Sequence, residues 1–249
     1  MAVTLKDIIH ENSEEGFLKL FENVFSQQNR KILESHKTIL RACYRNPDLC
    51  PYIEAEKEEE VAKKWIGRYE KGYRNRISNR ASKPPKTIAD PIVSVIIGAR
   101  LPQLTEEHLN QVKYAHRLSM SAENILGMLL EEFLAEQLAE YDWHCCWGAT
   151  ILHVDFCHVN GSLLQVKNRS NSENSSSSKV RTNRNIEVWY RVDARTGSYQ
   201  WKYFNDKYNT DRFSEENFIK FVIQVLKSNP GALPVEADNP WRDIATSSS

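Results

Sequence analysis

The spacing of apolar residues changes near Trp143, and this change constrains the fold more than any other feature of the sequence. In the first third of the chain, apolar residues recur every three or four positions, as between Phe17 and Phe25, which is the period of an amphipathic helix. After Trp143, short segments alternate apolar with polar residues and are rich in aromatic and β-branched types, which is typical of strands. Helices, then a mostly antiparallel sheet, then a helix predict an α/β or α+β core with a helical N-terminal part.

The same periodicities predict individual elements. Residues 53–76 and 214–227 are expected to be helical, and residues 105–141 are expected to form two helices broken near Ser119 and Ser121. A short apolar run at residues 92–97 is interpreted as a strand, and the tail from Asn229 is expected to be loosely held. Further strands are expected at residues 143–147, 151–159, 162–168, 186–192 and 199–204.

The chain is electrically balanced as a whole but not along its length. Its 249 residues include 33 basic and 33 acidic side chains, so a polyanionic partner has to be held by a local patch. An acidic run at residues 54–60 precedes a basic block between Lys63 and Lys86 that contains Glu70 as its only acid. This block either lies along a phosphate backbone or forms a solvated helix face balanced by the acidic run, and the charges leave both interpretations open.

Several classes of protein are disfavoured by composition. No apolar run approaches the roughly 20 residues of a membrane span, and the first residues resemble neither a signal nor a transit peptide. Five cysteines form a poor disulfide framework and suit a reducing compartment. We therefore expect a cytoplasmic protein with no membrane partner. The nine glycines show no phosphate-cradling arrangement, so no organic cofactor is expected.

The segment of residues 151–167 contains the side chains that point to chemistry. Asn160-Gly161 is a turn signal, and the loop length decides which side chains share a face of the hairpin. A two-residue loop places Asp155 on the opposite face from Gln165 and Lys167, whereas a three-residue loop pairs Asp155 with Gln165. Burial of one face favours the three-residue loop, because the other register mixes charges into the core. The apolar face of the favoured hairpin contains Val154, Phe156, Leu164 and Val166.

An acid, an amide and a lysine in this arrangement resemble the core of the PD-(D/E)XK nucleases. In that superfamily, an Asp on one strand and an acid-x-Lys on the next hold a divalent metal over the scissile phosphate. This sequence departs from the pattern twice, because Val154 replaces the usual proline and Gln165 replaces the usual acid. An amide oxygen can bind Mg²⁺ but carries no charge, so a further carboxylate is expected to compensate.

The preceding helix offers two glutamates for that purpose. At 100° per residue, Glu131 lies at the edge of the apolar stripe of this helix, whereas Glu132 points nearly away from it. Many restriction endonucleases keep an active-site glutamate on a helix in this position, so Glu131 is the candidate. The pattern alone leaves open that both glutamates are surface residues.

A second resemblance is more specific. The run from Lys167 to Ser175, in which Lys-Asn-Arg is followed by Asn-Ser-Glu-Asn-Ser, is similar to the type II restriction endonucleases of the SinI group, which includes AvaII-like enzymes. The similarity extends from about Gly127 to the last helix. It implies a restriction-endonuclease-like mixed sheet flanked by helices and Mg²⁺-dependent cleavage of double-stranded DNA at GGWCC. A palindromic site is read most simply by a homodimer in which each protomer cuts one strand.

The resemblance assigns roles to named residues. The expected catalytic residues are Asp155, Gln165, Lys167 and Glu131, and the expected metal ligands are Asp155, Gln165, the carbonyl of Val166, and Glu131. Lys167 would also orient the attacking water. The division expected is a helical region at residues 1–86 and a nuclease core at residues 87–249, with a DNA-recognition segment at 168–191. Its expected DNA-binding residues are Asn168, Arg169, Ser170, Asn171, Ser172, Asn174, Ser175, Lys179, Arg181, Arg184 and Asn185.

Other readings remain. A duplex-DNA-binding protein without catalysis would use the same Ser/Asn-rich run and would bind without metal, and a repair or nicking nuclease would share the core. A zinc cluster is disfavoured because the cysteines and histidines near Cys157 lack metal-binding spacing, so buried thiols and structural histidines are expected. A nucleophilic pair of Cys157 with His153 lacks an orienting third group.

Overall fold

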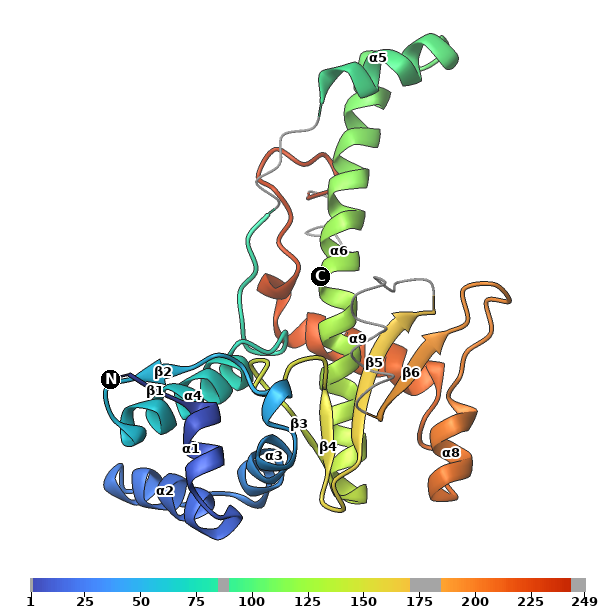
Figure 1. Cartoon of the computed structure of the whole chain (residues 1–249). Helices are drawn as coiled ribbons and strands as arrows, with labels where there is room; N and C mark the ends of the chain where they lie inside the picture. The colour runs from blue at the N-terminus through green and yellow to red at the C-terminus, as the bar shows by residue number, and fades with distance from the viewer. Residues whose placement is uncertain (1, 85–89, 171–184, 243–249) are drawn as a thin grey trace. The chain divides into compact units, whose positions relative to one another are not determined.

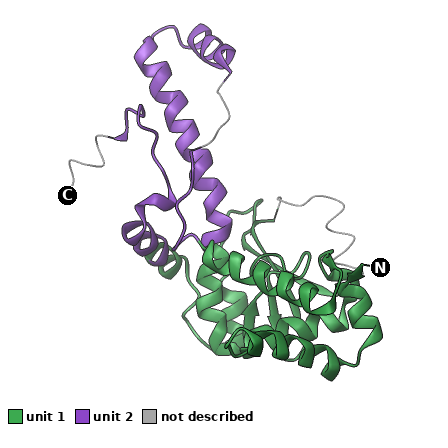
Figure 2. Ribbon diagram, turned by 90° about the vertical axis from the view of Figure 1, so that its left-hand side faces the viewer, with its two compact units in different colours: residues 1–76, 130–220 green, residues 77–129, 221–249 purple. Residues whose placement is uncertain are grey.

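The computed structural model describes residues 2–84, 90–170 and 185–242. Two compact units are distinguished by their contacts: residues 1–76 with 130–220, and residues 77–129 with 221–249 (Figure 2). This division differs from the expected boundary at residue 86. Because α6 and α9 pass from one unit to the other, each unit is described by itself.

The first unit contains most of the elements labelled in Figure 1. Its N-terminal part comprises β1 (Val3–Thr4), α1 (Leu5–Glu11), α2 (Glu14–Gln27), α3 (Glu34–Arg45), η1 (Pro47–Leu49), β2 (Glu54–Ala55) and α4 (Glu58–Arg74). Its second part comprises the end of α6 (Glu106–Leu138), η2 (Ala139–Tyr141), β3 (Trp143–Cys145), β4 (Phe156–His158), β5 (Leu163–Arg169), β6 (Ile186–Val192), α8 (Lys202–Tyr208) and the start of α9 (Glu215–Ser228). The second unit contains α5 (Pro91–Arg100), η3 (Pro230–Ala232) and the rest of α6 and α9.

The central sheet has the strand order β3-β4-β5-β6, in which β3-β4 and β4-β5 are antiparallel and β5-β6 is parallel. The sheet is therefore mixed, and the prediction of an α/β fold with a mixed sheet flanked by helices is confirmed. Phe156 pairs with Leu164 and Cys157 with Leu163. This is the register of the three-residue loop, in which Gly161 has a φ of 95° and donates its N–H to the carbonyl of His158.

Both faces of the sheet are buried. On one face, Cys157, Leu163 and Ile186 share a hydrophobic core with residues of α1 to α4, such as Phe21 and Trp65. The N-terminal helices are thus part of the same core as the strands. The burial expected for only one face of the hairpin extends to the other, which explains why Leu163 to Val166 are all buried.

The opposite face of the sheet packs on an aromatic cluster. Trp189 of β6 pairs with Val166 of β5 and so lies on the other face from Leu163. Its ring lies 5.1 Å from Trp201 and 4.8 Å from Phe204, and Phe133 of α6 lies 5.8 Å from Trp201. Helices therefore cover both faces, as in a three-layer α/β fold.

Two predictions failed before the sheet begins. The apolar run at residues 92–97 forms helix α5 and not a strand, because Asp90 caps it by accepting from the amide of Ile92 at 3.0 Å and Pro91 occupies its first turn. The expected break near Ser119 and Ser121 is absent, since α6 is continuous. The Ser121 hydroxyl donates to the Arg117 carbonyl one turn earlier, so the helix itself satisfies it.

Three more predictions failed within and after the sheet. Residues 151–155 lie outside strands, so β4 is only the end of the expected strand 151–159. Within residues 199–204, Tyr199 makes only an isolated bridge, and the chain then turns into α8. The described part of the tail is tied down, because Asn229 donates to the carbonyls of Ile77 and Arg80.

Candidate active site

The aspartate of the hairpin is held at the point where the β4-β5 ladder ends. Its N–H donates to the Leu164 carbonyl at 2.9 Å, and its Oδ2 accepts the amide of Val166 at 2.7 Å. The carboxylate therefore accepts a hydrogen bond from β5 that a backbone carbonyl of a paired strand would otherwise accept. This bond fixes it beside Gln165 and Lys167. Burial raises the pKa of Asp155, and the Val166 amide and Lys167 oppose that rise.

Glu131 of α6 reaches the same place. Glu131, Asp155 and Gln165 line one cavity of about 290 Å³. Burial raises the pKa of Glu131, the negative charge of Asp155 raises it further, and Lys167 lowers it. The cavity thus joins two carboxylates and an amide, and the lysine acts electrostatically on both acids. The four residues expected to be catalytic are brought together in the structure.

The second glutamate does not point into solvent. Only 2% of the Glu132 surface is exposed, so the side of α6 away from the apolar stripe is covered at this position. It lines a separate cavity of about 250 Å³ with Tyr69, Tyr73 and Arg76. The helix packs on more than one side near its C-terminal end, and a single-stripe argument does not anticipate this.

The loop before β4 forms a wall of the active-site cavity, and sequence analysis did not single it out. Gly148, Ala149 and His153 line the cavity and have φ values of 76°, 52° and 64°. Ala149 and His153 are in a region that residues other than glycine rarely adopt. The sequence signal for this loop was Gly148, because a glycine directly after Trp147 indicates a tight turn and not the last residues of a strand.

Only four of the expected DNA-binding residues are described. Asn168 accepts from Arg191 Nε at 2.9 Å, and the Ser170 hydroxyl accepts from the amide of Ala194 at 2.9 Å. Arg169 and Asn185 are exposed. The remaining seven, Asn171, Ser172, Asn174, Ser175, Lys179, Arg181 and Arg184, lie outside the described residues.

The arginine of β6 is buried, although it belongs to the expected DNA-recognition segment 168–191. Arg191 is 8% exposed and forms an ion pair with Glu215 of α9, which also accepts from Trp201 Nε1 at 3.0 Å. Because Arg191 also donates to Asn168, directly after Lys167, this network braces the end of β5. Its signal was an arginine on the same face of β6 as Trp189.

The cysteines behave as buried thiols, as predicted. Cys145, Cys146 and Cys157 are buried, and Cys146 Sγ lies 3.3 Å from Cys157 Sγ. Across residues 2–84, 90–170 and 185–242, no three His, Cys, Asp or Glu side chains are grouped to hold a metal ion. In the same parts of the chain, no helix has the length and hydropathy of a membrane span.

The chain is similar to known proteins over most of its length. The sequence profile of a family described as SinI restriction endonuclease matches residues 20–228. The type II restriction enzyme SinI of Salmonella infantis is 33% identical over 228 residues, which cover 87% of this chain and 95% of that enzyme. The type II restriction enzyme Eco47I of Escherichia coli is 33% identical over 226 residues, which cover 86% of this chain and 98% of that enzyme.

Proposed function

Because the chain belongs to the SinI restriction endonuclease family and is a type II site-specific deoxyribonuclease, we propose that it hydrolyses phosphodiester bonds with Mg²⁺ at the Asp155 cavity. The observation that carries the proposal is the fixed position of the Asp155 carboxylate, whose Oδ2 accepts the Val166 amide at 2.7 Å. Gln165 and Glu131 line the same cavity.

The donors in the cavity fit a hard divalent cation. Mg²⁺ prefers oxygen ligands, and the cavity offers the Asp155 and Glu131 carboxylates and the Gln165 amide. The pKa values of both acids are raised by burial, which means that their charged forms lack sufficient compensation in the protein alone. We propose Asp155, Gln165, Glu131 and the Val166 carbonyl as the ligands. When bound, Mg²⁺ supplies Lewis acidity that activates water and neutralises phosphoryl charge.

Each residue then has a distinct task. Asp155 is held rigidly by the Val166 amide, so its position does not depend on the ion. Glu131 supplies the negative charge that the neutral Gln165 lacks. Lys167 orients the attacking water, helps to remove its proton and stabilises the charge that develops on the phosphate. No residue forms a covalent bond to DNA.

The proposed substrate is double-stranded DNA with the site GGWCC. Its support is the resemblance of the run after Lys167 to the SinI group. Asn and Arg side chains of the segment 168–191 supply the donors that base edges and phosphates require. The exposed basic side chains of α4, such as Lys63 and Lys71, would contact the backbone. A homodimer would place one active site at each strand of the palindrome.

The test is cleavage of a plasmid of known sequence with and without Mg²⁺, followed by sequencing of the ends. Discrete fragments that depend on Mg²⁺ and end at GGWCC are expected. Cuts at another fixed site would refute the specificity and keep the chemistry. An intact plasmid that is retarded on a gel would instead support a binding protein without catalysis, and single-strand nicks would support a nicking nuclease.

Two substitutions locate the chemistry. Asp155→Asn and Lys167→Met are expected to abolish cleavage while the protein remains folded and still binds the duplex. Lys202→Met is the matched control, since Lys202 is an exposed lysine of α8 whose ion pair with Asp206 is also exposed. Full activity of either site variant would refute the assignment.

A further inference from the structure

Helix α5 is apolar on all sides and yet buries no residue within the part of the chain that is described. Only Ser94 and Arg100 among its residues are polar. Val95 is 61% exposed and Ile96 is 63% exposed, and Ile92 and Val93 are more than half exposed. A soluble protein rarely leaves such a cluster in water, so the helix is expected to have a partner.

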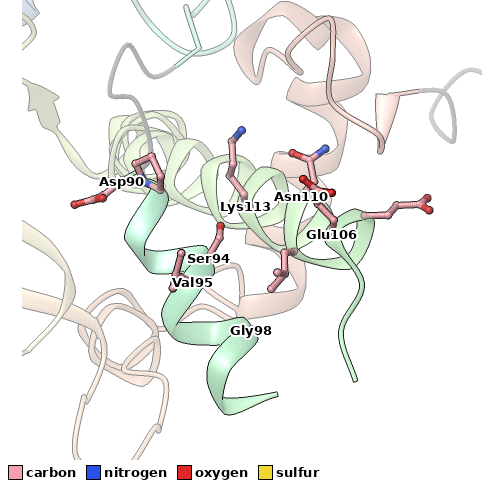
Figure 3. A pocket seen from close by; sticks show the side chains of 10 residues that line it. Asp90, Ser94, Val95, Gly98, Glu106, Asn110 and Lys113 are labelled. Atoms are coloured by element: carbon pink, nitrogen blue, oxygen red, sulfur yellow. The ribbon is translucent and has the colours of Figure 1, made fainter. Parts of the chain in front are cut away.

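The exposed residues form a stripe. Ile92, Val95, Ile96 and Ala99 recur at spacings of three and four, which places them on one face. The adjoining face, which contains Ser94 and Gly98, turns toward α6, where Gly98 lies close to Leu109, and Val95 lies at the border between the two faces. Between the two helices is an open cavity of about 700 Å³ (Figure 3). Only one side of α5 is therefore occupied.

We propose that this stripe is the surface through which two copies of the chain associate about a two-fold axis between Val95 and Ile96. The proposal rests on the homodimer in the proposed function and assigns its surface. An antiparallel pair of α5 helices would place Ile92 against Ala99 of the second copy and Val95 against Ile96 of the second copy. The stripe is self-complementary in this arrangement, as an isologous interface requires.

The charges at the ends of α5 favour the antiparallel arrangement. Asp90 precedes the helix and Arg100 ends it. Antiparallel pairing brings each of them close to the opposite charge of the second copy, whereas parallel pairing brings like charges together. The helix dipoles also attract each other when antiparallel. These features favour a second copy of this chain over an unrelated apolar partner.

The apolar surface of α5 supplies part of a dimer interface, and the segments outside the described residues carry little apolar area to cover it. The four large aliphatic side chains expose on the order of 400 Å², about half of what one partner contributes to a standard interface. Residues 85–89, 171–184 and 243–249 contain one large aliphatic residue each. None of these segments has the apolar area to bury the stripe.

Sedimentation equilibrium of the full chain without DNA tests the surface. The unmodified protein is expected to be dimeric at micromolar concentration. Ile96→Glu is expected to weaken association at least ~100-fold, because two charges would face each other in an apolar contact. Ile219→Glu is the matched control, since Ile219 is a 49% exposed isoleucine of α9. A monomeric unmodified protein, or a dimer that Ile96→Glu leaves intact, would overturn the proposal.

Cysteine cross-linking tests the axis in protein that is otherwise unmodified and folded. Val95→Cys is expected to form a disulfide-linked dimer under mild oxidation. Ile92→Cys is not, because antiparallel helices separate the two copies of position 92 by roughly 10 Å, beyond the reach of a disulfide. Cross-linking at 92 but not at 95 would overturn the antiparallel arrangement.

Sedimentation and cross-linking measure association whether or not the protein cleaves DNA. A protein that associates through α5 but leaves DNA intact with Mg²⁺ would refute the proposed function alone. If both proposals hold, Ile96→Glu is expected to accumulate nicked plasmid at low enzyme concentration, because separated protomers cut the two strands in separate encounters. Linear product at the unmodified rate from a monomeric Ile96→Glu would overturn the functional role of the surface.

Discussion

At the scale of single residues, the candidate active-site cavity holds two carboxylic acids away from the water that would otherwise stabilise their charged forms. Asp155 and Glu131 both have raised pKa values because they are buried, and each of them feels the positive charge of Lys167. Gln165 adds an amide oxygen to the lining of the cavity without a third negative charge. The replacement of the usual acid by an amide is therefore consistent with a cavity that already holds a helix glutamate.

The two adjacent glutamates of α6 are expected to differ in function. Glu131→Gln should lower kcat about 100-fold or more, because it removes a charge from the cavity that contains Asp155. Glu132→Gln should lower kcat less than about 10-fold, because Glu132 lines another cavity. Single-turnover cleavage and circular dichroism of both variants would check this. A larger loss of kcat for Glu132→Gln would contradict the assignment.

A buried histidine is expected to make stability sensitive to acid. Burial lowers the pKa of His36 from 6.5 to about 4, and its Nδ1 accepts the amide of Leu33 at 3.1 Å. Between these two values, the unfolded state binds the extra proton and the folded state does not. The free energy of unfolding should therefore fall by roughly 3 kcal/mol as the pH drops from 6.5 to 4, and change little from this group above 6.5.

Urea unfolding at several pH values would measure that slope. His36→Gln should flatten it, because glutamine can accept the Leu33 amide but does not titrate. His10→Gln, at an exposed histidine of α1, should leave the slope unchanged. An unaltered slope in His36→Gln would show that another group causes the acid sensitivity.

At the scale of elements, the active-site wall depends on a close approach between α4 and the loop before β4. A Cβ on Gly72 would overlap the backbone nitrogen of Gly148, and a Cβ on Gly148 would overlap the carbonyl of Arg68. The helix and the loop can approach this closely only because both positions are glycines. Gly148 lines the cavity, so the approach connects α4 to the site.

Gly72→Ala should therefore displace the loop. We expect a loss of about 1–3 kcal/mol in the free energy of unfolding and at least a tenfold loss of cleavage rate. Gly67→Ala is the control, because no atom lies within 4 Å of its added Cβ. That variant should gain about 0.5–1 kcal/mol from helix propensity. Chemical denaturation and initial cleavage rates would check both. Equal behaviour of the two variants would contradict the close-contact argument.

The sequence was sufficient for elements whose local signals agreed with their packing. The hairpin was predictable to its register because Asn160-Gly161 and the alternation around it allow one arrangement that keeps Asp155 and Lys167 off the apolar face. Helix α5 was missed because its apolar run resembles a strand and only Asp90 and Pro91 reveal a helix start. The burial of Glu132 and the network of Arg191 depend on contacts between distant segments, which no local pattern contains.

At the scale of the whole molecule, a net charge of zero leaves DNA binding to local surfaces. The N-terminal helices share a hydrophobic core with the sheet. They therefore support the strands that hold Asp155 and Lys167, whatever they contribute to DNA binding.

The metal site is expected to affect the stability of the entire protein. In metal-free buffer, Asp155→Asn should raise the melting temperature, because it removes a buried carboxylate that the protein compensates poorly. Millimolar Mg²⁺ or Ca²⁺ should raise the melting temperature of the unmodified protein and have little effect on the variant. Differential scanning calorimetry with and without EDTA would check both shifts. Equal shifts in the two proteins would place the metal elsewhere.

The parallel pairing of β5 with β6 also bears on how such an enzyme changes over evolution. Parallel neighbours cannot be joined by a tight turn, so no hairpin sets the alignment of β5 with β6. Both strands are aligned by their own ladder, from Leu163 with Ile186 onward. Mutations can change or lengthen the sequence between Arg169 and Ile186 while Lys167 keeps its position in β5. If the segment 168–191 and Lys167 have their proposed roles, a lineage can acquire a new target sequence without rebuilding the site that cuts it.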